Sequence, residues 1–276
     1  MSLLSDRLLI SLSPTALSWV RLRGVLRQRA VAKGSIDADP AHGDEPWAGV
    51  IAALRATTAT WHRDRVAVTV VLSNHFVRYA LVERPDSRVS RAEELALARF
   101  RFTRLHGARA AAWDVQVAAA NGVGPRVASA VDGALLEAIK AAFPREGRPK
   151  LKSVQPYLVC AFNHWRARLE APGAWLVLVE PGRVCLAMLA GKAWAAVQSV
   201  RSSYELPENW LDLLEREKHR TPVQPVPTAV FARASVAANT GSAAARGWRI
   251  AMLEAPDVDG ITVAERESYA MALHAA

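Results

Sequence analysis

The residues able to do covalent or metal chemistry are scattered along this sequence. No two of the seven histidines, at positions 42, 62, 75, 106, 164, 219 and 274, have the spacing of metal ligands on a helix, so a metal site is not expected. No nucleophile elbow, P-loop or Cys-x-x-Cys pair occurs. Residues 122–124 form a lone glycine turn, and 257–260 have the opening of a calcium loop without its later ligands. These motifs therefore point to no catalytic chemistry of their own.

Positive charge is concentrated in the first part of the chain. The 35 Lys and Arg exceed the 26 Asp and Glu, which gives a formal net charge of +9. Residues 171–276 hold 10 basic and 11 acidic residues, so residues 1–170 hold the other 25 and 15 and carry +10. The excess is mostly arginine, at positions 21, 23, 27, 29, 99, 101, 104 and 109.

This asymmetry suggests an anionic partner for the first part of the chain, although an Arg-rich composition alone would give the same pattern. Nucleic acid, an anionic lipid surface and an acidic protein tail all fit. Aromatic residues do not alternate with the arginines beyond Phe100 and Phe102. Nucleic acid is therefore the weaker expectation, because RNA-binding sheets use such aromatics for stacking.

The composition predicts a globular protein without a membrane-spanning helix. Of its residues 51% are hydrophobic and 22% charged. The longest apolar runs, such as 66–72 and 174–180, fall well short of the roughly 20 residues that a spanning helix needs. Asp6 and Arg7 interrupt the apolar N-terminus, which favours a first strand over a signal peptide. Cys160 and Cys185 lie in apolar segments, which predicts buried free thiols in a reducing compartment.

Hydrophobic periodicity predicts two runs of elements in the same order: three strands, a helix, then alternating strands and helices. The first run has strands at 7–12, 16–22, 25–32, 66–72 and 151–155, and helices around 46–54, 132–143 and 157–165. The second has strands at 174–180, 183–190, 193–200, 228–232 and 248–253, and helices after Pro207 and Ala264. This order predicts two similar α/β units with the pattern of the actin and sugar-kinase architecture.

An extra module interrupts the first run at residues 76–130. Ser90 and Glu93 have the spacing of a capping box, which predicts a helix that ends near Leu105. Strands are predicted at 75–82, 113–119 and 126–130. We therefore expect a first actin-like unit at residues 1–75 and 131–170, an inserted module at 76–130 and a second actin-like unit at 171–276.

Four segments carry a family resemblance: 9–17, 174–182 with 189–194 after it, 93–95 at the start of the module's helix, and 268–276. Through them the chain resembles the actin-like proteins of type IV pilus and type II secretion assembly platforms, the PilM type and the cytoplasmic part of the GspL type. The resemblance implies duplicated βββαβα units of the actin-like, ribonuclease H-like α/β fold. It also implies a small inserted module in the first unit and a reduced second unit.

The family resemblance implies an ATP cleft between the units, but the chain departs from the family pattern at each phosphate hairpin. Ser11 and Ser13 stand where the family has an aspartate and a glycine, and Pro14 has no N–H to offer a phosphate. Ser11 also cannot organise Mg²⁺ as a carboxylate does. In the second hairpin Glu180 and Gly182 are kept, with a proline between them.

The adenosine loop that the resemblance places at 233–242 has Gly241 as its only glycine. The family's small subdomain before strand 228–232 is replaced by about 27 residues. We therefore expect these hairpin and loop residues to be remnants of a nucleotide cleft, with ordinary turn chemistry as the alternative. No cofactor is expected, and ATP with Mg²⁺ is not favoured.

The resemblance implies a non-catalytic scaffold or adaptor that binds the short cytoplasmic tail of an inner-membrane platform protein. By resemblance, the tail lies in a groove between the first unit and the inserted module, and the alternative for its residues is ordinary packing. The expected lining residues are Phe76, Arg78, Tyr79, Leu81, Leu97, Phe100 and Arg101.

Further expected partners are the motor ATPase of the platform, a second copy of the chain and, weakly, the anionic membrane surface. The expected location is cytoplasmic, peripheral at the inner membrane.

Two alternatives to this function stay open. One is an active ATPase or small-molecule kinase of the same fold, since fold does not fix function. The other is a nucleic-acid-binding protein, which would bind with a steep salt dependence.

Overall fold

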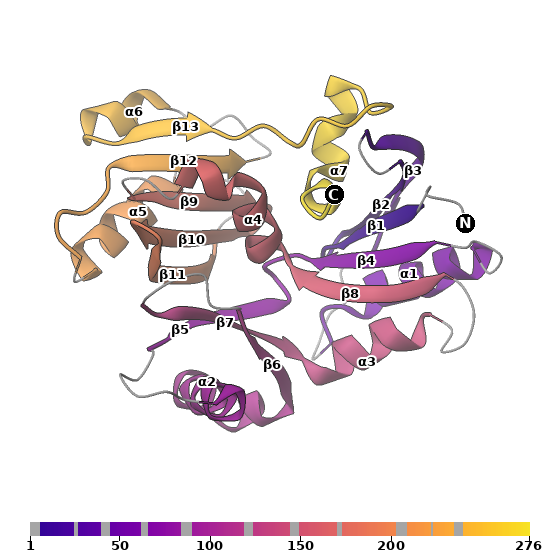
Figure 1. Ribbon diagram of the computed structural model, residues 1–276, viewed down its shortest axis with the longest axis horizontal. Coiled ribbons are helices and arrows are strands. Elements are labelled where there is room, and N and C mark those ends of the chain that lie inside the picture. The colour runs from indigo at the N-terminus through magenta and orange to yellow at the C-terminus, as the bar shows by residue number, and fades with distance from the viewer. Residues whose placement is uncertain are drawn as a thin grey trace. The chain divides into compact units, whose positions relative to one another are not determined.

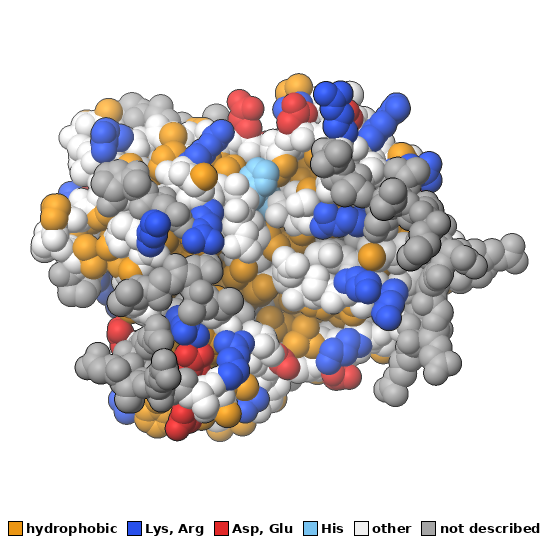
Figure 2. Space-filling view, viewed as in Figure 1, with side chains coloured by type: hydrophobic (Ala, Val, Ile, Leu, Met, Phe, Trp, Pro, Cys, Tyr) orange, Lys and Arg blue, Asp and Glu red, His pale blue; other side chains and the backbone are white. Residues whose placement is uncertain are grey.

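The computed structural model describes residues 6–24, 27–39, 45–61, 66–83, 90–118, 124–143, 149–169, 173–202, 209–221, 223–234 and 240–276. Its strands form three sheets, and each strand predicted from the sequence overlaps an observed one (Figure 1). Lys and Arg side chains are spread over the face of the molecule seen in Figure 2. No helix in the described part of the chain is both long and apolar enough to span a bilayer.

The first sheet has the strand order β3-β2-β1-β4-β8. Its strands are β1 (Arg7–Leu12), β2 (Ala16–Arg23), β3 (Arg29–Asp37), β4 (Ala67–Leu72) and β8 (Lys150–Pro156). β1 pairs antiparallel with β2 and parallel with β4, and all but the first residue of both β1 and β4 are buried. This burial explains why their sequences are nearly continuous apolar runs.

The predicted third strand, 25–32, lies further along the chain in the structure. Arg23 of β2 pairs with Arg29, so the ladder resumes only there and continues to Asp37. Gly24 has a φ of +104°, in the left-handed region where glycine is favoured. Residues 27 and 28 belong to no strand, so the predicted strand began too early, whereas residues 25 and 26 lie outside the described residues.

The second sheet has the strand order β11-β10-β9-β12-β13. Its strands are β9 (Gly173–Glu180), β10 (Arg183–Ala190), β11 (Ala193–Arg201), β12 (Ala229–Ala234) and β13 (Arg249–Met252). β9 to β11 form an antiparallel meander, and β12 pairs parallel with both β9 and β13. Strand by strand this repeats the topology of the first sheet, so the duplication predicted from the order of elements is confirmed.

The inserted module has a sheet of its own, in the order β5-β7-β6. It consists of β5 (Val77–Val82), α2 (Arg91–His106), a 3₁₀ turn η1 (Gly107–Ala112), β6 (Trp113–Val117) and β7 (Arg126–Asp132). The predicted capping box is present, because Ser90 and Glu93 each accept a hydrogen bond from the other's backbone N–H. Ala98 and Phe102 of α2 pack on Ala80, Val82 and the facing strand residues as one apolar cluster.

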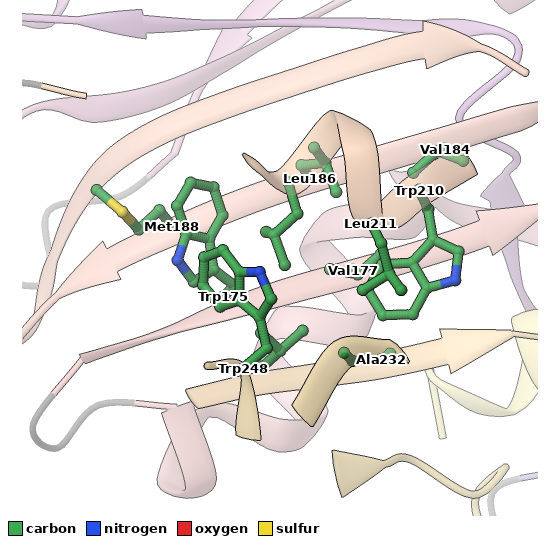
Figure 3. Packing of buried hydrophobic residues seen from close by; sticks show 12 residues of the cluster. Trp175, Val177, Val184, Leu186, Met188, Trp210, Leu211, Ala232 and Trp248 are labelled. Atoms are coloured by element: carbon green, nitrogen blue, oxygen red, sulfur yellow. The ribbon is translucent and has the colours of Figure 1, made fainter. Parts of the chain in front are cut away.

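Helices cover the two larger sheets. They are α1 (Ala48–Thr60), α3 (Gly133–Ala141), α4 (Tyr157–Leu169), α5 (Asn209–Arg220), α6 (Thr240–Ala245) and α7 (Arg266–Leu273), with a 3₁₀ turn η2 (Val263–Glu265) before α7. The core of the second sheet contains Trp175 and Trp248 at one end and Trp210 of α5 with Val184 at the other (Figure 3). Trp175 Nε1 donates to the carbonyl of Pro227 at 3.0 Å, which satisfies its buried N–H.

By its packing the chain divides into two compact units. Unit 1 comprises Met1–Val77, Asp132–His164 and Ala255–Ala276, and it contains the first sheet. Unit 2 comprises Arg78–Val131 and Trp165–Glu254, and it contains both the second sheet and the inserted module. α7 belongs to unit 1, where Tyr269 and Leu273 pack on Leu9 of β1. The boundaries at 75, 130 and 170 follow the topological repeat and stay a prediction.

Candidate functional site

The first of the two predicted phosphate hairpins is closed by hydrogen bonds within itself. Ser11, buried on β1, donates from Oγ to the carbonyl of Ser18 at 3.4 Å. Ser13 Oγ accepts from the N–H of Ala16 at 3.0 Å and lies 3.1 Å from its carbonyl oxygen. Both hydroxyl groups therefore form hydrogen bonds to nearby backbone, as ordinary turn residues do when they stabilise a bend.

The second hairpin brings Glu180, Gly182 and Arg183 together. Glu180 ends β9 and Arg183 begins β10, and the two are cross-strand partners that are both buried. Gly182 has a φ of +76° in the two-residue turn, a conformation that favours glycine there. Gly241 lies within α6, and residues 235–239 of the predicted adenosine loop lie outside the described residues. The residues of the first hairpin belong to unit 1, whereas Glu180, Gly182 and Gly241 belong to unit 2.

Unit 2 contains a cavity of about 480 Å³, and four of the seven predicted groove residues line it. They are Arg78, Tyr79 and Leu81 of β5 and Arg101 of α2. The other three lie outside its lining: Phe76 belongs to unit 1, and Leu97 and Phe100 are exposed on α2. This cavity lies between the inserted module and the second sheet, whereas the groove was predicted between the first unit and the inserted module, so the groove stays a prediction.

The cavity lies between the edges of two strands. Residues 78–81 of β5 and 195–199 of β11 line it as unbroken runs. Successive side chains of a strand point to opposite faces of its sheet, so an unbroken run can line one cavity only if the edge of the strand faces it. In agreement, β5 and β11 are each the outermost described strand of their sheets, and Figure 1 shows them next to each other. The backbones of two sheet edges therefore border this space.

Helix residues complete the cavity wall. Besides Arg101, α2 supplies Leu105, which is 53% exposed, and His106. The end of α5 and the residue after it supply Glu217, Arg220 and Thr221. The wall thus combines apolar side chains with several basic groups and one described carboxylate.

Several arginines beside the cavity repel one another electrostatically. Arg183 of β10 is the cross-strand partner of Arg201 on β11, so two like charges stand directly opposite in the ladder. Burial and the charges of Arg183, Arg109 and Arg201 lower the pKa of Arg78. We call these four residues, Arg78, Arg109, Arg183 and Arg201, the basic cluster. Burial together with Arg78 and Arg109 also lowers the pKa of His106, which disfavours a further positive charge there.

Two described acidic groups near the cavity lie close to arginines. Glu217 is buried and lies 3.3 Å from Arg220 and 3.8 Å from Arg216. Glu180 faces Arg183 across the hairpin, and its charge partly offsets the lowering of the Arg183 pKa by burial. Each of these two carboxylates thus lies close to an arginine.

Neither cysteine is suited to thiolate chemistry. Both are free and buried, as predicted from the sequence. Burial raises the pKa of Cys160 to about 12 and raises that of Cys185 as well. A thiol held protonated at neutral pH is a poor nucleophile and metal ligand. Among the described residues no three His, Cys, Asp or Glu side chains group as metal ligands.

Sequence reasoning missed the half of the wall contributed by β11 and α5. Residues 195–199 were predicted as a strand, and α5 was recognised only by Trp210, Leu211 and Leu214 of its buried face. One signal was available, because β11 is the third strand of a meander and such a strand lies at the margin of its sheet. The residues next to this outer strand depend on how the inserted module packs. Hydrophobic periodicity carries no information about that packing.

Comparison with known proteins defines the fold class. No protein-family model matches the sequence, and no curated protein matches it significantly. Among solved structures, the PilM–PilN type IV pilus biogenesis complex contains a chain with a TM-score of 0.68 at 14% identity, covering 98% of this chain and 96% of that one. The protein therefore has the actin-like α/β fold, as predicted.

Two further solved structures agree with this class. The cytoplasmic domain of EpsL, an inner-membrane component of the type II secretion system of Vibrio cholerae, gives a TM-score of 0.56 at 14% identity, covering 96% of this chain and 93% of that one. A Bacteroides thetaiotaomicron protein with an actin-like ATPase fold gives 0.60 at 9% identity, covering 90% and 91%. At these identities the likeness shows the fold alone.

Proposed function

We propose that this protein is an actin-fold assembly protein of a type IV pilus or type II secretion platform. In this role it binds the cytoplasmic tail of a membrane protein and hydrolyses no nucleotide. Support comes from the fold it shares with PilM, known from a complex with PilN, and with the cytoplasmic domain of an inner-membrane secretion component. The protein then works at the cytoplasmic face of the inner membrane, with the motor ATPase and further copies of itself as additional partners.

The observation that carries this proposal is the pair of sheet edges at the cavity. β5 and β11 both expose an edge to the same space of about 480 Å³. An extended peptide can add to such an edge through main-chain hydrogen bonds, while pockets beside the edge accept its alternate side chains. A short tail of a membrane protein is a ligand of this kind. Leu81, Leu105 and Val197 offer it apolar contacts.

The non-catalytic part of the proposal rests on the two hairpins. Ser11 and Ser13 bond to their own hairpin backbone, and Glu180 faces Arg183. Each turn also contains a proline, which has no N–H for a phosphate. A phosphate cradle needs free backbone N–H groups and a carboxylate available to Mg²⁺. These observations support a degenerate cleft and a scaffold rather than an ATPase or kinase.

The test is a binding assay with candidate tails. Fluorescently labelled peptides are made from the cytoplasmic N-terminal segments of the single-span membrane proteins of the host's pilus and secretion platforms, and their binding is measured by fluorescence anisotropy. We expect one of them to bind, with an affinity that Mg²⁺ and ATP leave unchanged. Ala196→Phe enlarges a residue that lines the cavity and also packs against the apolar core of the second sheet, and it is expected to weaken binding about tenfold or more.

The matched control is Ala96→Phe, which makes the same change at an exposed position of α2 outside the cavity lining. It is expected to bind like the wild type. Thermal unfolding of both variants checks that they are folded. The proposal fails if none of the tail peptides binds, or if the folded Ala196→Phe protein binds its peptide as tightly as the wild type does.

A further inference from the structure

The helix α2 leaves large apolar side chains exposed. Ala98 and Phe102 pack on the sheet of the inserted module, whereas Leu97, Phe100 and Leu105 are 39%, 62% and 53% exposed. No other helix or strand in the described ranges exposes three large apolar side chains. Exposed apolar residues that gather in this way mark a surface that interacts with something else.

Arginines flank these apolar residues. Arg99, Arg101 and Arg104 are exposed and lie within four residues of Phe100 on the same helix. The Arg104 guanidinium group lies over the Phe100 ring, 5.9 Å from its centroid. Within the described parts of the chain, no carboxylate lies at ion-pair distance from these three arginines. We call Leu97, Phe100, Arg99, Arg101 and Arg104 the outer face of α2.

The acidic residues of α2 are confined to its first turn, where each has a partner. Glu93 accepts from the backbone N–H of Ser90 at 2.7 Å. Glu94 lies 2.7 Å from Arg126. Residues 95–113 contain four arginines and neither Asp nor Glu. Exposed Phe and Leu beside arginines are typical of a helix that lies in a lipid interface, where apolar side chains enter the headgroup region and cations stay near the phosphates.

We propose that the outer face of α2 rests on an anionic membrane surface. Leu97 and Phe100 enter the headgroup layer, and the three arginines bind lipid phosphates. This inference goes beyond the proposed function, because it assigns a lipid contact that needs no tail in the cavity.

A lipid surface fits the outer face of α2 better than an acidic protein does. Neither Leu97 nor Phe100 lines the described cavity, so both project from the convex surface of the helix. A bilayer accepts projecting side chains without a matching shape, whereas a protein interface needs complementary packing. A second argument rests on the proposed function. Arg101 and Leu105 also line the cavity, so a short tail anchored in the bilayer would enter beside the lipid contact.

Vesicle sedimentation tests this contact on the full chain. Binding is measured to vesicles of phosphatidylethanolamine and phosphatidylglycerol in equal parts, and to neutral phosphatidylcholine vesicles. We expect the wild type to bind the anionic vesicles, more weakly at high salt, and to bind the neutral ones far less. Phe100→Ser should lower the partition coefficient on anionic vesicles about tenfold. Arg104→Gln should lower it about fivefold.

Two matched control variants make similar changes away from α2. Val263→Ser alters a side chain of η2 that is 75% exposed, and Arg55→Gln alters an exposed arginine of α1. Both are expected to bind vesicles like the wild type, and thermal unfolding checks that all variants are folded. A wild type that stays in solution with the anionic vesicles overturns the inference and leaves the outer face of α2 to an acidic protein partner. Equal binding by all the variants overturns it as well.

A thiol label reports whether the apolar side chains enter the lipid. Cys160 and Cys185 are buried and their pKa values are raised, so a maleimide-linked dye attaches to an introduced surface cysteine. A polarity-sensitive dye on Phe100→Cys should shift its emission to the blue when anionic vesicles are added. The same dye on Arg55→Cys should not shift. An unshifted dye at position 100 of the bound protein overturns the inference.

Tail binding in solution separates this inference from the proposed function. Phe100 lies outside the cavity lining, so Phe100→Ser is expected to bind a tail peptide like the wild type. If the vesicles bind through the outer face of α2 and no tail binds, the proposed function fails and the lipid contact stands. If a tail binds and the vesicles do not, the lipid contact fails and the proposed function stands.

Discussion

The two five-stranded sheets have the same strand order, but their meander edges are bordered differently. β3 and β11 are topological equivalents, each the third strand of its meander and the outermost described strand on that side. The edge of β3 is paired with a segment of the same chain. Ala30 N–H donates to the carbonyl of Asp259 at 2.7 Å, and Arg29 forms a parallel bridge with Asp259. The edge of β11 lines the cavity.

Side chains also stabilise the covered edge, which is the edge of β3 that pairs with Asp259. Lys33 of β3 donates to the carbonyl of Gly260 at 2.9 Å and to Glu265 Oε2 at 2.8 Å. Glu265 in turn accepts from the N–H and hydroxyl of Thr262, which caps the turn before α7. Gly260 has a φ of +88°, and a Cβ built on it would lie 2.6 Å from the carbonyl oxygen of Ala30. Only glycine lets the backbone come this close.

This difference indicates which of the two equivalent edges, that of β3 or that of β11, is open to a partner. An unpaired sheet edge invites strand addition, and proteins usually cover it with their own chain. Here one copy of the edge is paired internally with Asp259, and the other lines a cavity. Variants that disturb each edge in turn test whether this contrast is built into the sequence.

The largest effect is expected from Gly260→Ala, which disrupts the covered edge. The new methyl group would meet the Ala30 carbonyl, and the left-handed φ is unfavourable for alanine. We expect a loss of about 3 kcal/mol in the free energy of unfolding, measured by urea denaturation. Hydrogen exchange should show that the Ala30 amide loses protection.

Gly247→Ala separates backbone strain from the clash at Ala30. Gly247 has a φ of +79°, and a Cβ there would have no heavy atom within 4 Å. Its substitution is therefore expected to cost only about 1 kcal/mol, from the backbone conformation alone. Equal losses for the two variants would contradict the role given to the close contact at the covered edge.

A smaller effect is expected from Ser90→Ala, which loosens the helix behind β5. The substitution removes the side chain that accepts from Glu93 N–H at 3.3 Å and caps α2. Losing such a cap costs about 1 kcal/mol. We expect faster hydrogen exchange in the first turn of α2, with no change at Ala30. Thr262→Ala removes the corresponding cap beside the covered edge and should accelerate hydrogen exchange around residues 263–265. The reverse pattern in either variant would contradict the idea that each cap stabilises only the helix or turn that it begins.

The elements could be predicted because their signals are local. The apolar run of β9, the Ser90 capping box and the turn at Gly182 each depend on residues that are neighbours in sequence, and the repeated order of elements then indicated the duplicated fold. The exception was the start of β3, since Arg27 and Gln28 were included in the predicted strand but precede the first paired residue, Arg29. Local signals are sufficient for strands, caps and tight turns.

The site was only half predictable, because it depends on packing between distant segments. Arg78 and Arg101 were singled out, but their neighbours across the cavity on β11 and α5 were not. Nothing in residues 195–199 differs from an ordinary strand, and Glu217 lies on a helix whose apolar face gave the only signal. The excess of arginine in the first part of the chain indicated an anionic partner without indicating that Arg183 and Arg201, from the balanced second part, join the same cluster.

The smallest effect concerns the pH dependence of the covered edge. The hydrogen bond from Lys33, with those from Thr262, lowers the pKa of Glu265 from 4.5 to about 2. A carboxyl whose pKa is lower in the folded state stabilises the protein above its unfolded pKa, and this stabilisation is lost as the pH falls from about 4.5 towards 2. Glu265→Gln should therefore have a lower melting temperature than the wild type at neutral pH, and the difference should shrink over that acid range. Because the pair is solvent-exposed, the difference should also shrink in high salt. A difference in melting temperature that does not depend on pH would mean that Glu265 supports the edge by packing rather than by its charge. Lys33 would then contribute to the contrast between the two edges only through its bond to Gly260.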